Sequence, residues 1–323
     1  MPFSAARYVA ATALLWFTAS IADAQPNAVS PFPRGLAGTL AFQSDARGQL
    51  NPNGRVKIYT IDLASGRITA LTRDGDWDDE QPRWSPDGQR IAFRSNRSGS
   101  YNLYVMDADG RNVRRLTNHG GNDHDPSWLP DGQSFVFTSD RDRGFGRFDL
   151  YRYFLADGSV ERLTNSFEGY AFMPSVSPDG NWVAFVSTTF PIEGGWANQV
   201  HVLEIATKQT WPFDASAYGC WPNWSPDGQT IAHVWLVNDK TPSTIHTINS
   251  FGEDPEPIPD ETAQWHYYPD WSPDSRLLAI AVSPEHHEGE NWDLAILDPT
   301  RVTPLRRLTT GAGNDRLPDW KPR

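Results

Sequence analysis

Acidic and aromatic side chains gather at one repeated place in this sequence, directly before the proline of a recurring Pro-x-Trp segment. Carboxylates, imidazoles and aromatic rings held together can bind a peptide segment, a sugar or a divalent metal. Because the segment recurs at a regular interval, we expect these side chains to meet in space as one partner-binding site. Its members are Asp79, Glu80, Asp123, Asp125, Trp221, Trp265, His266, Tyr267 and Asp315.

Known catalytic signatures do not accompany these residues. The sequence has no Gly-x-Ser-x-Gly nucleophile elbow, and His286-His287-Glu288 lacks the spacing of a zincin helix. The single cysteine, Cys220, cannot form an internal disulfide or supply a cysteine-based zinc site. We therefore expect no catalytic residue among the candidates, and these absences favour a protein that is not an enzyme.

The composition is that of a folded chain with many turns. Hydrophobic residues make up 38% of the 323 residues and include 14 Trp, which argues against disorder, while 26 Pro and 25 Gly favour short strands over long helices. Lys and Arg number 28 against 40 Asp and Glu, a formal net charge of −12. Because a nucleic-acid-binding surface or an anchor to an anionic membrane needs the opposite sign, we expect neither.

Residues 1–24 are typical of an export signal. A positive charge precedes a mainly apolar stretch over 8–21, and Ala22-Asp23-Ala24 has the small-x-small pattern of a cleavage site. The apolar stretch is shorter than a membrane-spanning helix requires. We therefore expect a periplasmic or secreted protein with no membrane insertion after cleavage, in which a short linker over 25–34 precedes one folded domain over 35–323.

The repeated segment predicts the fold. Its first full copy is Pro82-Arg83-Trp84-Ser85-Pro86-Asp87-Gly88. Each of the first five copies is followed by a buried-strand pattern, an alternating pattern and a short polar strand, and a truncated sixth copy ends the chain. A period of this length fits one four-stranded blade of a β-propeller. The first prolines of the six copies lie 44 to 49 residues apart, at Pro82, Pro126, Pro174, Pro222, Pro269 and Pro318.

The two ends of the chain complement each other. The first unit has patterns for a second, third and fourth strand, over 40–42, 56–62 and 68–72, but none for a first strand. The last unit has only a first strand, over 316–320. We therefore predict an all-β, six-bladed β-propeller with blades of four antiparallel strands. The C-terminal strand completes the first blade and closes the ring, which leaves no free sheet edge around it.

These motifs resemble the TolB-like propeller repeat, whose pattern is x-x-Pro-x-Trp-Ser-Pro-Asp-Gly-x-x-Ile-Ala-Phe, then Leu-Tyr-x-Met-Asp-x-Asp-Gly and Leu-Thr. The resemblance covers the chain after the leader, with Val176 in place of Trp and Ser275 in place of Gly. It implies the six-bladed fold but no single function, because the same blades occur in the periplasmic TolB protein, in prolyl-peptidase and tricorn-type propeller domains and in oligogalacturonate lyases. Only 25–34 stand before the first blade, so we expect a propeller without the α/β domain of TolB.

Strand direction predicts which face carries the site. If each Pro-x-Trp strand runs away from the top face, the Ser-Pro-Asp-Gly turns lie at the bottom. The loops from second to third strands then lie on top, and they are long, for example 44–55, 139–147, 187–199 and 283–292. Binding residues usually lie on such loops. We therefore expect the site on the top face, at the mouth of the central channel.

Two histidines near the channel are metal-ligand candidates. His124 and His266 both belong to the residues that precede a repeat proline. The lyase members of the resembled family hold their metal with channel histidines, which makes a divalent metal the alternative here. Two histidines fall short of the three protein ligands usual in a catalytic zinc site, so we expect no cofactor.

The sequence thus predicts a non-catalytic scaffold that binds a protein or an extended peptide at the channel mouth. Rigid blades would hold the site with little ordering on binding. One alternative is a metal-dependent polysaccharide lyase or hydrolase of the oligogalacturonate-lyase type, with His124 and His266 as ligands, although the acidic residues argue against polyuronate substrates. A further alternative is a glycan-binding propeller that uses the aromatic residues.

Overall fold

The computed structural model describes residues 26–48, 51–73, 75–192, 195–213, 219–236, 240–253, 255–259, 262–285, 290–300, 304–311 and 313–323. The predicted export signal over 1–24 lies outside these described residues, as do His286 and His287. The described part of the chain is all β, and it holds no helix long and apolar enough to cross a membrane.

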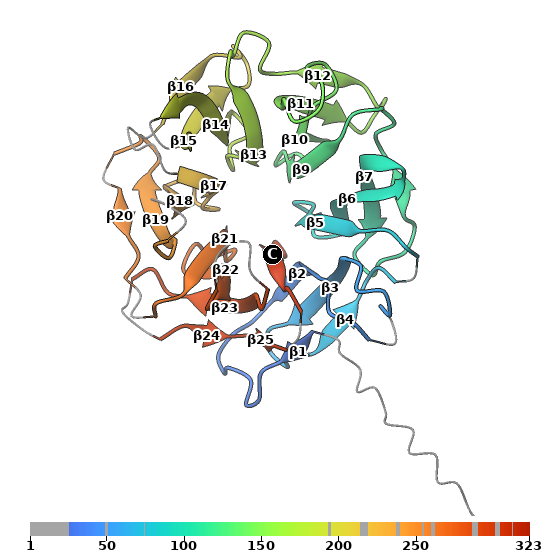
Figure 1. The fold of residues 1–323 in the computed structure, drawn as a ribbon, viewed down its shortest axis with the longest axis vertical. Helices are drawn as coiled ribbons and strands as arrows, with labels where there is room; N and C mark the ends of the chain where they lie inside the picture. The colour runs from blue at the N-terminus through green and yellow to red at the C-terminus, as the bar shows by residue number, and fades with distance from the viewer. Residues whose placement is uncertain are drawn as a thin grey trace, which may run out of the picture.

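Six four-stranded antiparallel sheets form a ring (Figure 1). Residues of all six innermost strands line a central channel. Blade 1 contains β26 (Arg316–Trp320), β2 (Thr39–Ser44), β3 (Lys57–Asp62) and β4 (Ile68–Ala70); blade 2 contains β5 (Asp79–Trp84), β6 (Arg90–Ser98), β7 (Ser100–Asp107) and β8 (Arg114–Arg115). Blade 3 contains β9 (Asp123–Trp128), β10 (Ser134–Ser139), β11 (Asp149–Phe154) and β12 (Val160–Arg162); blade 4 contains β13 (Tyr170–Val176), β14 (Trp182–Ile192), β15 (Gly195–Glu204) and β16 (Thr210–Pro212). Blade 5 contains β17 (Gly219–Trp224), β18 (Thr230–Trp235), β19 (Thr244–Asn249) and β20 (Glu256–Pro257); blade 6 contains β21 (Trp265–Trp271), β22 (Leu278–Ser283), β23 (Asp293–Leu297) and β24 (Arg306–Arg307).

The predicted closure of the ring is confirmed. β26, the last strand of the chain, pairs antiparallel with β2, and Trp320 lies opposite Leu40. A second pairing joins the two ends of the chain at the rim, where β1 (Asn27–Ala28) pairs antiparallel with β25 (Thr309–Thr310). Part of the segment predicted as a linker therefore holds the two ends of the chain together.

The second strand of each blade forms the core of the ring. Phe93, Phe137 and Ile280 on β6, β10 and β22 are fully buried. Both faces of a blade pack against neighbouring blades, so these strands carry continuous apolar runs rather than an alternation with polar residues. The Ile-Ala-Phe pattern in the repeats has this physical cause.

The turns between first and second strands have the Ser-Pro-Asp-Gly pattern or, in blade 3, Leu129-Pro130-Asp131-Gly132 and, in blade 6, Ser275 in place of the glycine, and they need a left-handed residue at their last position. Gly132 has φ 62°, and a Cβ placed there would meet its nearest neighbours at 3.8 Å, which is ordinary contact. We therefore expect Gly132→Ala to lower the free energy of unfolding by about 1 kcal/mol, through backbone strain alone. Urea unfolding measures this, with Gly120→Ala as the control because Gly120 has open space around it and no left-handed φ. An equal loss in both variants would contradict the assignment.

Candidate functional site at the channel mouth

A bulge interrupts the innermost strand of every blade directly before the repeat proline. The residue directly before each repeat proline has a left-handed backbone, and the pairing of the inner strand with its neighbour shifts at that point. Such bulges re-aim a side chain. The six residues and their φ values are Gln81 (56°), Asp125 (50°), Met173 (55°), Trp221 (53°), Tyr268 (58°) and Leu317 (52°).

Four of these six residues line a cavity of about 480 Å³ that spans blades 2 to 5. The wall is mainly apolar, with a few polar groups among the aromatic side chains, which is the usual make-up of a ligand pocket. Trp221 packs edge-on against Tyr268, with 4.6 Å between ring centroids. The lining residues are Gln81, Arg94, His124, Asp125, Thr138, Gly146, Phe148, Tyr170, Phe172, Met173, Thr188 and Trp221.

A chain of hydrogen bonds passes from blade to blade along one side of the mouth. The Gln81 amide N–H donates to Gln43 Oε1 at 2.9 Å, and the Asp125 N–H donates to Gln81 Oε1 at 2.8 Å. The Gln81 side-chain amide also donates to the Asp125 carboxylate, which accepts a further hydrogen bond from the Met173 N–H. Burial raises the pKa of Asp125. The Met173 side chain has no oxygen that could accept a hydrogen bond from the next blade, so the chain of hydrogen bonds ends there. Blades 5 and 6 meet instead through the rings of Trp221 and Tyr268.

Arg94 connects Glu80 to His124 on the cavity wall. Its Nε donates to Glu80 Oε2 at 2.9 Å, and its guanidinium also donates to His124 Nδ1. Arg94 lies over the Tyr101 ring, with its guanidinium carbon 4.5 Å from the ring centroid. The Tyr101 hydroxyl donates to Glu80 Oε1 at 3.0 Å. Burial and the nearby Arg94 charge lower the pKa of His124 to about 3. His124 is therefore a neutral imidazole whose proton lies on Nε2, because a guanidinium only donates.

Asp79 and Asp123 lie inside their blades rather than on the cavity wall. Each is fully buried and accepts a hydrogen bond from an arginine: Arg97 Nη2 lies 2.6 Å from Asp79 Oδ1, and Arg141 Nη2 lies 2.8 Å from Asp123 Oδ1. Both arginines belong to Ser-x-Arg runs at the C-terminal end of the second strand, and Ser139 Oγ also donates to Asp123 at 2.6 Å. These carboxylates therefore join the inner strand to its neighbour.

Asp315 holds the position in blade 1 that Asp79 and Asp123 hold in blades 2 and 3, but no arginine donates a hydrogen bond to it among the described residues. The position that corresponds to Arg97 is Ala46, and no lysine or arginine among the described residues forms an ion pair with Asp315. The carboxyl group accepts hydrogen bonds from Ser44 and Thr309. Burial raises its pKa to about 7. Asp315 is therefore a buried acid held without a compensating charge.

The three candidates in blade 6 belong to the packed interior. Trp265 and Tyr267 lie in a core cluster, where Tyr267 meets Trp292 edge-on at 5.5 Å between ring centroids. His266 is 2% exposed, and its backbone N–H and carbonyl both bond to Ser243 Oγ, at 3.1 and 2.8 Å. Of the predicted site residues, Asp125 and Trp221 thus line the mouth cavity directly, and Glu80 holds Arg94 there.

The donor set of the described residues does not fit a metal centre. No three His, Cys, Asp or Glu side chains of the described ranges come together in a group that could hold an ion. His124 already receives a hydrogen bond from Arg94 at Nδ1, and His266 lies in the packed interior. These described side chains therefore offer an ion no complete set of ligands.

Arg94, Phe148 and Tyr170 were missed by sequence reasoning. Arg94 ends the apolar run of β6, and a charge directly after Ile-Ala-Phe was the one signal that pointed to it. Phe148 and Tyr170 lie outside the groups of three residues before the repeat prolines. Only the packing of blades 3 and 4 brings them to the cavity wall.

Six closed blades of four strands, with an apolar cavity at the mouth of the channel, define a six-bladed β-propeller with a ligand-sized pocket. The family model described as the TolB beta propeller domain matches residues 52–210. Residues 52–210 therefore belong to the TolB-like β-propeller family, and the other described blades continue the same six-bladed ring.

Relatives and solved structures agree with this assignment. A TolB homolog of Chlorobium luteolum is 30% identical over 160 residues, which are 50% of this chain and 34% of that protein. The chain thus spans about a third of that relative's length. The crystal structure of TolB from Acinetobacter baumannii has a TM-score of 0.69 at 22% identity, covering 91% of this chain and 69% of that one. An oligogalacturonate lyase in complex with manganese has a TM-score of 0.54 at 16% identity, covering 84% and 73%. At these identities, both structures support the fold alone.

Proposed function

We propose that this protein is an exported, non-catalytic propeller that binds a segment of a partner protein in the channel-mouth cavity. The observation that carries the proposal is the cavity of about 480 Å³ between blades 2 and 5, with its mainly apolar wall. The export signal predicted over 1–24 supports the exported location.

The chemistry of the wall suits a peptide segment. Phe172, Met173 and Trp221 form an apolar surface for a buried side chain, and methionine adapts its shape to different partners. Arg94 and the neutral His124 can donate hydrogen bonds to peptide carbonyl groups, while Asp125 can accept one from a peptide N–H. Aromatic anchors surrounded by a few polar groups are typical of the centre of a protein interface.

The same residues favour binding over catalysis. The lyase in complex with manganese holds its metal in a related fold. In this chain an arginine lies against His124, and the cation lowers the affinity of that imidazole for a second positive charge. Glu80 is likewise engaged by Arg94 and Tyr101.

Selection from a random peptide library displayed on phage tests the proposal. We expect selected peptides to bind the purified chain, and Trp221→Ala to weaken that binding roughly 30-fold, because a central aromatic anchor is removed. Isothermal titration calorimetry with the synthetic peptides measures the affinities. Val160→Ala is the control, because Val160 is an exposed apolar side chain on the outer strand β12.

Two outcomes would overturn the proposal. Peptides that bind Trp221→Ala as tightly as the unchanged chain would move the site away from the mouth. Near-stoichiometric metal in the purified protein, lost in a His124→Ala/His266→Ala double variant, would instead indicate the polysaccharide-cleaving alternative. Circular dichroism on each variant excludes a loss of fold as the cause.

A further inference from the structure

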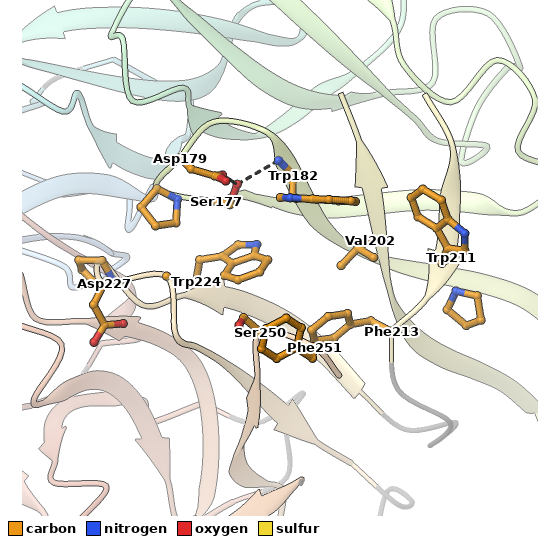
Figure 2. A pocket seen from close by; sticks show the side chains of 14 residues that line it. Ser177, Asp179, Trp182, Val202, Trp211, Phe213, Trp224, Asp227, Ser250 and Phe251 are labelled. Carbon is orange, nitrogen blue, oxygen red and sulfur yellow. Dashed lines mark hydrogen bonds between the residues drawn. The ribbon is translucent and has the colours of Figure 1, made fainter. Parts of the chain in front are cut away.

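A second hollow lies on the opposite face, between blades 4 and 5. It has a volume of about 770 Å³, and the Ser-Pro-Asp-Gly turns of both blades form one side of it. Figure 2 shows the aromatic side chains that surround this groove, which come from β14, β16, the residue after β16, β17 and the turn after β19. Phe251 is 84% exposed and Trp211 is 40% exposed, so the aromatic surface is open to solvent.

An internal comparison between blades indicates what the groove can hold. At the junction of blades 2 and 3, Arg90 fills the corresponding place. Its guanidinium carbon lies 5.1 Å from the centroid of the Trp128 ring, and its Nη2 donates to the Gly132 carbonyl at 3.1 Å. The same Nη2 lies 3.8 Å from Asp87 Oδ2. A tryptophan face, a turn carbonyl and a turn carboxylate thus form a socket for a guanidinium group.

All three parts of that socket recur between blades 4 and 5. Counted from the repeat proline, Trp224 corresponds to Trp128, Gly228 to Gly132 and Asp179 to Asp87, and all three line the groove. The position of Arg90 itself is taken by Trp182. The chain therefore keeps the socket at this junction but does not supply the cation.

Other observations agree with a missing cation. At the junction of blades 1 and 2, Lys321 lies over the repeat tryptophan, with its Nζ 4.9 Å from the Trp84 centroid. Among the described residues no lysine or arginine lies over Trp224, and none lines the groove. The charged groups of the lining are the exposed carboxylates of Asp179 and Asp227.

We propose that this groove binds an arginine side chain from an extended segment of a partner protein. The guanidinium group stacks on Trp224 and bonds to the Gly228 carbonyl and the Asp179 carboxylate, as Arg90 does within the chain. Trp182, Trp211 and Phe213 hold the apolar residues on either side of the arginine, since aromatic-lined grooves suit extended, proline-containing segments. This second site goes beyond the proposed function and shares no residue with the channel mouth.

Titration with a pair of peptides tests the inference. The probes are Ac-Leu-Pro-Arg-Pro-Leu-NH₂ and the same peptide with citrulline, which keeps the planar shape of arginine but has no charge. We expect saturable shifts of the Trp224 and Trp182 indole N–H signals in NMR spectra, assigned with Trp→Phe variants. The citrulline peptide is expected to bind roughly tenfold more weakly, because the cation–π contact and the ion pair are lost.

Three variants locate the contact. Trp182→Arg restores the internal arginine, so it is expected to fill the socket and abolish the shifts caused by the peptide. Asp179→Asn is expected to weaken binding about fivefold. Its matched control is Asp131→Asn, the same turn position in blade 3, which lies outside the groove and is expected to change nothing.

The inference is overturned if the arginine peptide produces no saturable shift, or if the citrulline peptide binds as tightly. It is also overturned if Trp182→Arg, shown to be folded by circular dichroism, binds like the unchanged chain. Should Trp182→Arg fail to fold, the peptide pair and Asp179→Asn still decide the question.

Discussion

Replacing Trp320 by alanine is expected to lower the free energy of unfolding by about 4 kcal/mol, because this indole closes the ring. The side chain is 7% exposed and packs in a core cluster with Leu40 and Phe42 of the neighbouring strand. A Cβ on Gly38 would lie 2.7 Å from its Nε1, so the indole fits directly against that glycine. Its backbone N–H also donates to Asp270 Oδ2 of blade 6 at 2.6 Å.

Urea unfolding followed by circular dichroism measures this effect. Val113→Ala, a change at a partly exposed side chain of blade 2, is the control and is expected to stay within about 0.5 kcal/mol of the unchanged chain. A loss below about 1 kcal/mol in Trp320→Ala would mean that closure by the C-terminal strand contributes little to stability.

The second large effect concerns the buried acid of blade 1. Burial raises the pKa of Asp315 from 3.8 to about 7, so the folded state holds a proton that the unfolded state releases. The stabilising contribution of this group is therefore complete below pH 4 and is lost as the pH rises to about 7. Asp315→Asn removes that titration and keeps a neutral, hydrogen-bonding side chain. The quantity to compare is the free energy of unfolding of the variant minus that of the unchanged chain. We expect this difference to be about 3 kcal/mol larger at pH 8 than at pH 4.

Asp123→Asn is the matched comparison and is expected to act in the opposite direction. Asp123 has the same place in blade 3 but bonds to Arg141, which is 11% exposed. Removing the carboxylate leaves that arginine without its charged partner, at a cost of about 3 kcal/mol at pH 8. Denaturant unfolding of both variants at pH 4 and pH 8 measures the two effects. An unchanged pH slope in Asp315→Asn, or a stabilised Asp123→Asn, would contradict this account.

Most of the fold could be predicted from the residues. The Pro-x-Trp-Ser-Pro-Asp-Gly copies specify turns whose geometry is local, since proline presets φ and glycine accepts the left-handed position. The missing first strand of the first unit and the lone strand over 316–320 complement each other, which predicts the pairing of β26 with β2. Such features can be read from the chain because they depend on near neighbours or on a regular period.

The members of the candidate site were harder to predict. The three residues before each repeat proline look equivalent in the sequence, yet in blade 2 Asp79 is buried against Arg97, Glu80 holds Arg94, and only Gln81 lines the cavity. The bulge at the third residue interrupts the strict alternation of a strand, so the period of two does not predict which side chain faces the channel.

The sequence by itself therefore determined the number of blades, the turns and the closure of the ring, because each rests on local backbone preference repeated along the chain. Only the tertiary structure decided which carboxylates carry an arginine partner and which aromatic residues form open walls. Arg90 at one blade junction and Trp182 at the equivalent position of another show why: the consequence of a residue depends on what the next blade places against it. Those contacts join residues about 40 positions apart, and no local preference encodes them.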